Sequence, residues 1–301
     1  MGLSGAWIAI LCIAFAQEAA EDLQAETKVV SALETRLQSL VGDFVAVERH
    51  KKGEGRGHIR ALRLPGDFIG RDYWSEARDR RVYAGTDVLQ LQANGEARHW
   101  WFGSKGDRAE ATGFWDDRQL VLVVRDGDGD PKRRYTYDFQ ANGTKAFHFQ
   151  NDHYGRKGYS WFMDADYRRQ KVQLPADFLP ERDQGDGVFE ALAGEFHSSE
   201  HGRHLGRNLF DGEWLVLQTA MDHAVVSTGW FGKVTMWLWT EDGEFHRLDG
   251  KRRRRVLELK SERDGRVQYR RRLEWLETGG YRVEAWNQHG RRIGPAREYR
   301  P

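Results

Sequence analysis

Short runs of alternating residues, separated by tight-turn dipeptides, are the feature of this sequence that most restricts its fold. Tyr135, Tyr137 and Phe139 alternate with Thr136 and Asp138, which is the two-residue period of a half-buried strand. Similar runs, rich in β-branched and aromatic residues, occupy 82–92, 119–125, 134–139 and 145–150. Asn-Gly, Asp-Gly and Gly-Gly pairs, which favour tight hairpins, begin at residues 94, 142, 242, 249, 264 and 279. The spacing predicts an antiparallel meander that closes into a barrel or a sandwich.

Four short matches in the same order indicate that this pattern occurs twice in the chain. The matched segments are 40–44 with 192–196, 65–69 with 211–215, 94–96 with 242–244, and 151–153 with 287–289. We therefore predict an all-β chain of two tandem antiparallel barrels, 41–170 and 188–301. Residues 171–187 contain Pro175 and Pro180 and no apolar period, and are expected to be a linker.

The N-terminus resembles an export signal. Residues 6–16 form an apolar run that is too short to cross a bilayer comfortably, and Ala14-Phe15-Ala16 is a small-x-small cleavage pattern. We predict a signal peptide over 1–16 and an exported protein, periplasmic or extracellular, with no membrane span after cleavage. The alternative is an uncleaved N-terminal anchor. Cleavage after Ala16 would remove Cys12, the only cysteine, so no disulfide would support the fold.

An amphipathic helix is expected between the signal segment and the first barrel. Residues 17–40 contain no Pro or Gly and place apolar side chains three or four residues apart along much of the segment. These apolar residues are Leu23, Val30, Leu33, Leu37 and Leu40. We predict that the helix covers one end of the first barrel; a short coiled-coil dimer is the alternative.

The charge balance argues against a nucleic-acid partner. Lys and Arg number 47 and Asp and Glu 46, which leaves a net charge of +1 and no cationic domain. The basic runs 251–255 and 270–272 lie near acidic residues and are expected to form cross-strand ion pairs. Residues 188–301 carry 20 basic and 17 acidic side chains (+3), against 27 and 29 before them (−2), a difference that would favour docking of the two halves.

Aromatic content distinguishes this chain from a disordered one. Phe, Trp and Tyr make up 12% of the residues although 31% are charged. Two barrels with charged residues facing outward and aromatic residues facing inward would account for both values.

The segment 111–169 resembles a known family. Its features are the Gly113-x-Trp115-Asp116 turn, the strand Arg134–Tyr137, and a terminal Phe162-Met163 followed by Tyr167-Arg168-Arg169. In these it is similar to an uncharacterised bacterial family of calycin-like (lipocalin-superfamily) β-barrels. The second copy keeps the Leu192-x-Gly194 opening and the Gly212-x-Trp214-Leu215 strand. The resemblance implies barrel folds and carries no activity with it.

Three groups of potential metal or cofactor ligands have simpler interpretations. The acidic turn fails the calcium-loop template at its sixth and twelfth positions, and the histidine cluster contains Gly202, which disfavours a zinc-binding helix. A histidine near the end of each copy is the only basis for a haem site. These groups are Asp126, Asp128 and Asp130; His197, His201 and His204; and His153 with His289. We expect a hairpin turn, an exposed loop and inherited strand ends, with no metal and no cofactor.

The function predicted first is non-catalytic binding of a small apolar or aromatic molecule inside a barrel, because small closed barrels can hold one such ligand. The aromatic residues expected to line the pocket are Tyr135, Tyr137, Phe147, Trp161, Trp237 and Trp286. One alternative is a structural or protein-interaction scaffold of the cell envelope. Another is a hydrolase or isomerase with buried carboxylates and histidines in a cavity; neither a nucleophile elbow nor a phosphate loop is found in the sequence.

Overall fold

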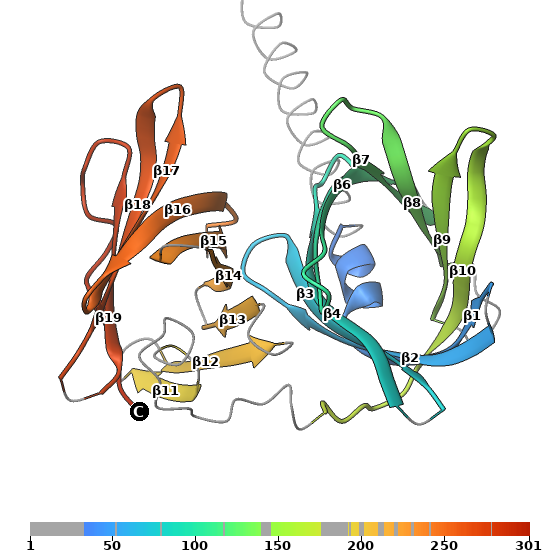
Figure 1. Ribbon diagram of the computed structural model, residues 1–301, viewed down its shortest axis with the longest axis horizontal. Coiled ribbons are helices and arrows are strands. Elements are labelled where there is room, and N and C mark those ends of the chain that lie inside the picture. Colours follow the sequence, from blue (N-terminus) through green and yellow to red (C-terminus); the bar gives the residue numbers. More distant parts are fainter. Residues whose placement is uncertain are drawn as a thin grey trace, which may run out of the picture.

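The protein folds into two antiparallel sheets, as the alternating pattern predicts (Figure 1). The computed structural model describes residues 33–51, 53–78, 80–116, 118–139, 146–175, 192, 194–198, 202–209, 214–219, 222–229, 232–240, 242–277 and 279–301. The predicted signal segment, the start of the predicted helix and most of the predicted linker lie outside these residues. Within the described ranges, no helix is both long and apolar enough to cross a membrane.

The first sheet is a closed barrel of ten strands. In chain order they are β1 (Gly42–His50), β2 (Gly53–Arg63), β3 (Phe68–Ala77), β4 (Arg80–Leu91), β5 (Glu96–Gly103), β6 (Arg108–Trp115), β7 (Gln119–Arg125), β8 (Pro131–Asp138), β9 (Phe147–Gly155) and β10 (Gly158–Arg169). Each strand pairs with the next, and β10 returns to pair with β1, so this sheet has no free edge. Ten strands enclose a wider interior than the eight of a small ligand-binding barrel.

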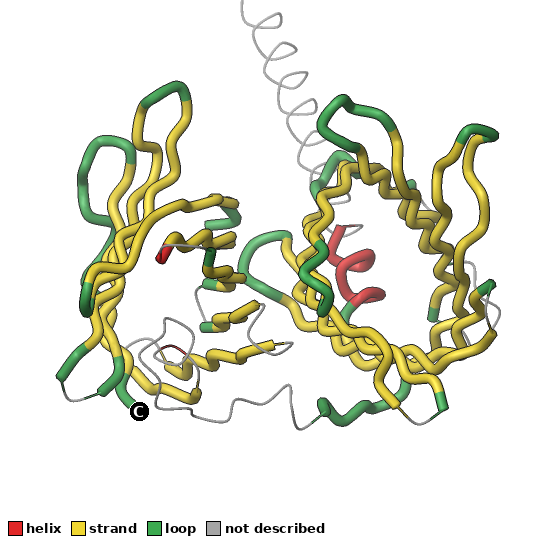
Figure 2. The backbone as a smooth tube through the Cα atoms, in the orientation of Figure 1, coloured by secondary structure: helices red, strands yellow, loops and turns green. Residues whose placement is uncertain are grey.

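A short helix over residues 33–40 fills one end of this barrel (Figure 2). Leu37 and Leu40 are buried in the barrel core, where they join Phe44 and Phe147. Arg169, at the end of β10, donates hydrogen bonds to carbonyl oxygens of Gln38, Ser39 and Val41, at and just beyond the last turn of the helix. The described part of the helix therefore covers a barrel end, as predicted from its apolar spacing.

The second sheet also has ten strands and is strongly curled. They are β11 (Gly194–Ser198), β12 (Gly202–Leu209), β13 (Trp214–Gln218), β14 (His223–Thr228), β15 (Lys233–Trp239), β16 (Phe245–Arg253), β17 (Val256–Arg263), β18 (Arg266–Trp275), β19 (Tyr281–Asn287) and β20 (Arg297–Tyr299). Its edges meet at one point, where His197 and Arg300 exchange two backbone hydrogen bonds of 2.7 and 2.9 Å. The second copy is thus a curled sheet whose edges are joined at one bridge, rather than a fully paired barrel.

Strand β15 shows how the two sheets fit together. Val234, Met236 and Leu238 face the interior of the second sheet. Trp237 and Trp239 alternate with them and face the first barrel. Both faces of this strand are apolar because both are covered.

The two sheets share an aromatic core. Strands β3 and β4 of the barrel face the second sheet (Figure 1), and outward-facing side chains of β3, β4 and β5 pack against outward-facing side chains of β13, β14 and β15. The buried members are Leu64, Phe68, Trp74, Ala84, Val88, Trp100, Phe102, Trp214, Val216, Val225, Trp237 and Trp239. The buried side chains of this contact are all apolar. The expectation that aromatic residues face only inward is wrong at this surface, because the second sheet removes it from water.

Two of the four sequence matches reach equivalent places in the two sheets: the starts of β1 and β11, and the starts of β3 and β13. The match of 94–96 with 242–244 pairs the β4–β5 turn with the β15–β16 turn, which are not equivalent in strand order. Asx-Gly pairs report a turn geometry and not a position in the fold, so this match does not align the copies.

The charged segments singled out in the sequence have ordinary roles in this fold. Asp126 accepts the backbone N–H groups of Asp128 and Asp130 and pairs with Lys132, which makes the acidic segment a hairpin turn. Arg270 pairs with Glu258 on the neighbouring strand, as expected for the basic runs. No group of three or more potential metal ligands occurs among the described residues.

Candidate ligand-binding cavity

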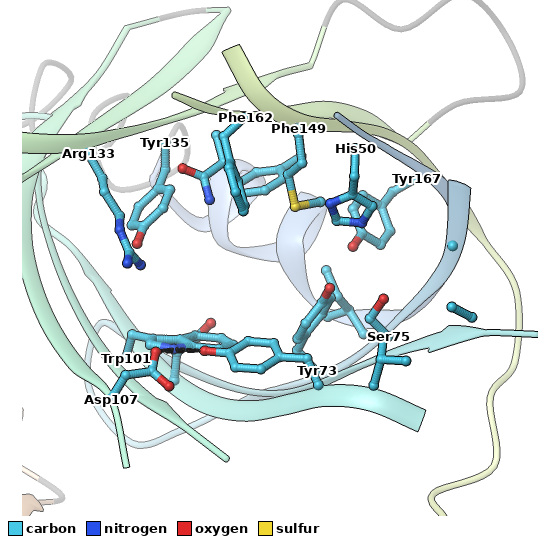
Figure 3. A pocket seen from close by; sticks show the side chains of 18 of the residues that line it. His50, Tyr73, Ser75, Trp101, Asp107, Arg133, Tyr135, Phe149, Phe162 and Tyr167 are labelled. Carbon is cyan, nitrogen blue, oxygen red and sulfur yellow. Dashed lines mark hydrogen bonds between the residues drawn. The ribbon is translucent and has the colours of Figure 1, made fainter. Parts of the chain in front are cut away.

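The first barrel contains a cavity of about 1100 Å³ at the end opposite the helix. Its lining comes from β1–β5, from β8–β10, and from the turns that follow β1, β3 and β5. Figure 3 shows side chains from opposite sides of the barrel facing one another across this space. The helix and the core around Phe44 and Phe147 fill the other end of the barrel, and residues of the hairpin turns line the cavity at its mouth.

One side of the cavity is a wall of three aromatic rings from β3, β4 and β5. The Tyr83 and Trp101 rings stack with centroids 5.9 Å apart, and Tyr73 meets Trp101 edge-on at 5.8 Å. Trp101 lies flat over Gly85, where an added Cβ would be only 2.2 Å from the indole ring. Asp107 accepts hydrogen bonds from the Tyr83 hydroxyl and the Trp101 indole N–H, which locks both rings in place.

The opposite wall comes from β8, β9 and β10. Phe149 packs against Tyr135 and Tyr137, with ring centroids 6.1 and 4.9 Å away. Nearer the mouth, Phe162 stacks on His153 at 4.1 Å with the rings almost parallel. The register of β10 shifts between Trp161 and Met163, and this irregularity allows Phe162 to line the cavity beside Met163. The two walls leave a slot with aromatic surfaces on both sides (Figure 3).

A buried polar network forms the floor. Arg71 donates to Asp87 at 2.7 Å and to the Tyr137 hydroxyl at 2.9 Å. The other oxygen of Asp87 lies 3.4 Å from His99 Nε2. Burial alone would raise the pKa of Asp87, but Arg71 and His99 outweigh it and hold that pKa below its usual value. Burial would likewise lower the pKa of Arg71, yet Asp87 and Tyr137 keep it above the ordinary range, so the pair stays ionised.

A second buried acid lies behind the cavity wall. Glu48 of β1 is fully buried and accepts hydrogen bonds from the hydroxyls of Tyr73 (2.6 Å), Ser75 and Tyr167 (3.2 Å). Burial, followed by the negative charge of Glu48, raises the pKa values of Tyr73 and Tyr167 well above their usual value, so both remain hydroxyl donors. Gly57 makes room for this carboxylate, because an added Cβ would be 2.2 Å from Glu48 Oε1.

Cationic side chains surround the mouth of the cavity. Lys51, Arg78 and Lys105 come from three different hairpin turns, and Arg133 projects inward from β8. Arg133 stands beside Tyr135 on the side of the cavity formed by β8–β10 (Figure 3). Burial, followed by Arg133 and Lys51, lowers the pKa of the neighbouring His153, which is therefore neutral at neutral pH.

The structure brings two of the six predicted pocket residues to this cavity. Tyr135 and Tyr137 line it, whereas Phe147 packs below it in the core against Phe44 and Tyr167. Trp161 is half-exposed on β10 and does not line the cavity. Its expected inward position is wrong because the register shift gives that place to Phe162.

The two predicted residues of the second copy lie elsewhere. Trp237 is buried in the contact between the sheets. Trp286 is on the face of β19 opposite Val283, with the Arg270 guanidinium 5.2 Å from its ring centre. Both were expected to face inward; both face outward, because parity along a strand separates two faces without saying which is the interior.

The pair of histidines considered for haem does not occupy equivalent places. His153 is within β9 and lines the cavity. His289 is exposed in the turn after β19, where its backbone N–H bonds to the Asn287 side chain.

Sequence reasoning missed Glu48, Arg71, Asp87 and Trp101. Each has the parity of buried apolar neighbours on its own strand, as Glu48 has with Phe44 and Ala46. A charged residue at such a position is a usable signal, because ionised side chains are rarely buried without a partner.

Comparisons with known proteins add little to this geometry. No protein-family model matches the chain, and no curated protein matches it. Among solved structures, the crystal structure of Rv2717c from M. tuberculosis is similar over 46% of this chain and 98% of its own, with 13% sequence identity and a TM-score of 0.38. A likeness this distant carries no conclusion about function.

Proposed function

We propose that this protein binds a small apolar or aromatic molecule, without transforming it, in the cavity of its first barrel. The observation that carries the proposal is the slot between the Tyr73–Tyr83–Trp101 wall and the Tyr135–Phe149–Phe162 wall. A flat ring system in this slot would meet aromatic faces or edges on both sides, an arrangement that stabilises aromatic pairs beyond the burial of their area.

The size of the cavity supports this proposal. Ligand pockets commonly measure about 300–1000 Å³, so a volume of about 1100 Å³ suits a molecule at the upper end of that range. The walls are preorganised, because Asp107 holds Tyr83 and Trp101 and Glu48 holds Tyr73 before any ligand arrives. Preorganisation reduces the entropy lost on binding.

The buried ionisable groups favour binding over acid–base catalysis. The pKa of Asp87 is lowered and that of Arg71 is raised, so neither group exchanges a proton near neutral pH. Burial raises the pKa of Tyr137 to about 12, which keeps its hydroxyl protonated as well. Arg71, Asp87 and Tyr137 can therefore orient a polar group of a ligand while each keeps one charge state.

The setting of this activity is part of the proposal. The apolar run at 6–16 supports export, and the Gly113-x-Trp115-Asp116 turn and the 162–169 terminus support a calycin-like origin for the barrels. The second sheet would act as a support that holds β3, β4 and β5, and thus one aromatic wall, in position.

The test uses a neutral fluorescent aromatic compound, N-phenyl-1-naphthylamine, titrated into the full chain. We expect saturable binding that Phe162→Ala weakens by about threefold to tenfold, the range expected for loss of one aromatic contact. Phe114→Ala is the matched control, because Phe114 is exposed on β6 and does not line the cavity. Native mass spectrometry of the exported protein should in addition show a bound small molecule. No binding of the dye and no co-purifying mass would overturn the proposal.

A further inference from the structure

We propose that the natural ligand is an amphipathic organic anion, whose acidic group lies at the cavity mouth against Arg133 while its apolar body occupies the slot below. This inference rests on the proposed function and adds the chemical class of the ligand.

Strand β8 provides the first argument, because it carries three consecutive basic residues in different situations. Lys132 pairs with Asp126 at 2.8 Å and Arg134 pairs with Asp152 at 2.7 Å, both outside the cavity. Arg133 lies between them with the inward parity of Tyr135 and Tyr137. Among the ion pairs of the described residues, none includes Arg133. The two outward cations are paired with carboxylates, whereas the inward one lies beside the Tyr135 hydroxyl and has no carboxylate partner among the described residues.

The surroundings of Arg133 also favour binding of an anionic group at this side chain. Its side chain is half-buried and stands beside the Tyr135 hydroxyl, in a site where water competes less than at an open surface (Figure 3). A guanidinium offers paired N–H donors that match a carboxylate, sulfonate or phosphate, and hydrogen bonds between ionised partners are stronger than neutral ones. Arg133 lies at the cavity mouth beside one aromatic wall, so a single ligand can contact both aromatic walls and this guanidinium.

The rest of the mouth is cationic too. Lys51, Arg78 and Lys105 line it, and no ion pair among the described residues involves any of the three. Three carboxylates also line the cavity: Glu54, Asp107 and, in the floor, Asp87, which is paired with Arg71. A positive potential at an opening with low-dielectric walls attracts anions and raises their rate of entry.

Asp107 forms no ion pair with Arg133 among the described residues. One of its oxygens accepts the Tyr83 hydroxyl at 2.7 Å and the Trp101 indole N–H at 3.2 Å. The other oxygen is buried against Gly103, where an added Cβ would lie only 2.2 Å away. Its carboxylate is therefore directed into the wall rather than toward the opposite side of the mouth.

The experiment compares two dyes that share one aromatic body and differ in charge. 8-Anilinonaphthalene-1-sulfonate carries an anionic group, and N-phenyl-1-naphthylamine lacks it. We expect the anionic dye to bind the full chain about tenfold more tightly than the neutral dye, the size of effect expected for one charged hydrogen bond. Arg133→Gln should remove most of that difference by weakening the anionic dye alone. Arg98→Gln is the control, because Arg98 is exposed on β5 and does not line the cavity.

The outcomes separate this inference from the proposed function. Equal affinities for the two dyes, or a difference that survives Arg133→Gln, would overturn the inference and leave the binding cavity in place. Failure of both dyes to bind would overturn the proposed function itself. If Arg133→Gln does not fold, the salt dependence of the unaltered chain decides: raising salt should weaken the anionic dye and not the neutral one, and equal responses contradict the inference.

Discussion

The indole N–H of Trp214 donates a 3.0 Å hydrogen bond to the backbone carbonyl of Gly103, from one sheet to the other. Both residues are buried, and the Trp214 ring packs edge-on against Phe102 at 5.1 Å. A polar bond inside an apolar contact restricts how the two sheets can slide over each other, because breaking it would leave a buried carbonyl without this donor.

Trp214→Phe should lower the free energy of unfolding by about 1–3 kcal/mol, since the variant keeps most of the ring but removes the donor. Urea unfolding followed by far-UV circular dichroism measures this change. Trp161→Phe, at a half-exposed position, is the control and should change stability by less than about 0.5 kcal/mol. Equal stability of the Trp214 variant and the unaltered chain would show that the bond contributes nothing.

Gly85→Ala should displace Trp101 from the cavity wall. The added Cβ would lie 2.2 Å from the indole ring, and overpacking of this kind costs about 1–3 kcal/mol of stability. We also expect weaker binding of N-phenyl-1-naphthylamine, because the wall loses its shape. Gly155→Ala has nothing within 4 Å of the added carbon and should leave dye binding unchanged. Tight dye binding by the Gly85 variant would remove Trp101 from the proposed site.

Glu48→Gln tests the buried carboxylate behind the wall. Three hydroxyls donate to Glu48, and a Gln side chain has a single acceptor oxygen, so at least one donor loses its partner. We expect the free energy of unfolding to fall by about 1.5–3 kcal/mol, the range for hydrogen bonds to charged groups. Glu54→Gln at the exposed mouth serves as the comparison and should be nearly neutral. Similar effects of the two substitutions would contradict a structural role for Glu48.

Arg71→Met should be more damaging, because it leaves the Asp87 carboxylate buried without its cation. Removing one partner of a buried ion pair costs about 3–5 kcal/mol, whereas replacing both is much less costly. The double variant Arg71→Met/Asp87→Leu should therefore recover most of the loss in a guanidinium unfolding experiment. The deficit of the single variant should shrink at low pH, where Asp87 accepts a proton. If the double variant is as unstable as the single one, the loss of stability comes from the broken hydrogen-bond network and not from the unpaired Asp87 charge.

Stability should fall as pH decreases below about 6.5. Burial is the main cause that lowers the pKa values of His58, His153 and His246 below their usual value of 6.5. Between the lowered values and 6.5 the unfolded chain binds more protons than the folded one, so protons favour unfolding there. Urea midpoints measured from pH 8 to pH 5 should show the decrease.

Substituting one of these histidines tests the cause of the pH dependence. His58→Phe should reduce the slope, since His58 is buried and stacks on Trp74 at 4.9 Å. His289→Phe, in an exposed turn, should leave the slope unchanged. A slope that is the same in all three proteins would assign the effect to other groups.

Local pattern was sufficient for several elements. Strand β7 spans 119–125, the same residues as the alternating run, and β4 and β8 differ from their runs by three residues or fewer at each end. The apolar spacing of Leu33, Leu37 and Leu40 correctly predicted a helix that packs on the barrel. These features depend on residues that are close together in the chain, so they can be predicted from the sequence alone.

The residues that line the cavity were only partly predictable, because alternation along a strand does not show which of its two faces is the interior. On β5 the consecutive residues His99, Trp100, Trp101 and Phe102 alternate between the cavity and the contact with the second sheet. Both faces are largely aromatic, so alternation could not tell which Trp lines a cavity. Tyr135 and Tyr137 were correctly predicted to line the cavity because they alternate with the polar residues Arg134 and Thr136, which form the other face of β8.

Local sequence pattern is sufficient for an antiparallel all-β chain with tight hairpins and an amphipathic helix before the first barrel, because the two-residue pleat, the hairpin turn and the helical apolar spacing each depend on residues close together in the chain. Tertiary structure alone decided that ten strands close the first sheet while the second closes at a single bridge. It also decided that Trp237 belongs to a contact and Trp101 to a cavity. Those outcomes depend on strand number, register and the surface that each sheet removes from water, all of which join residues far apart in the chain.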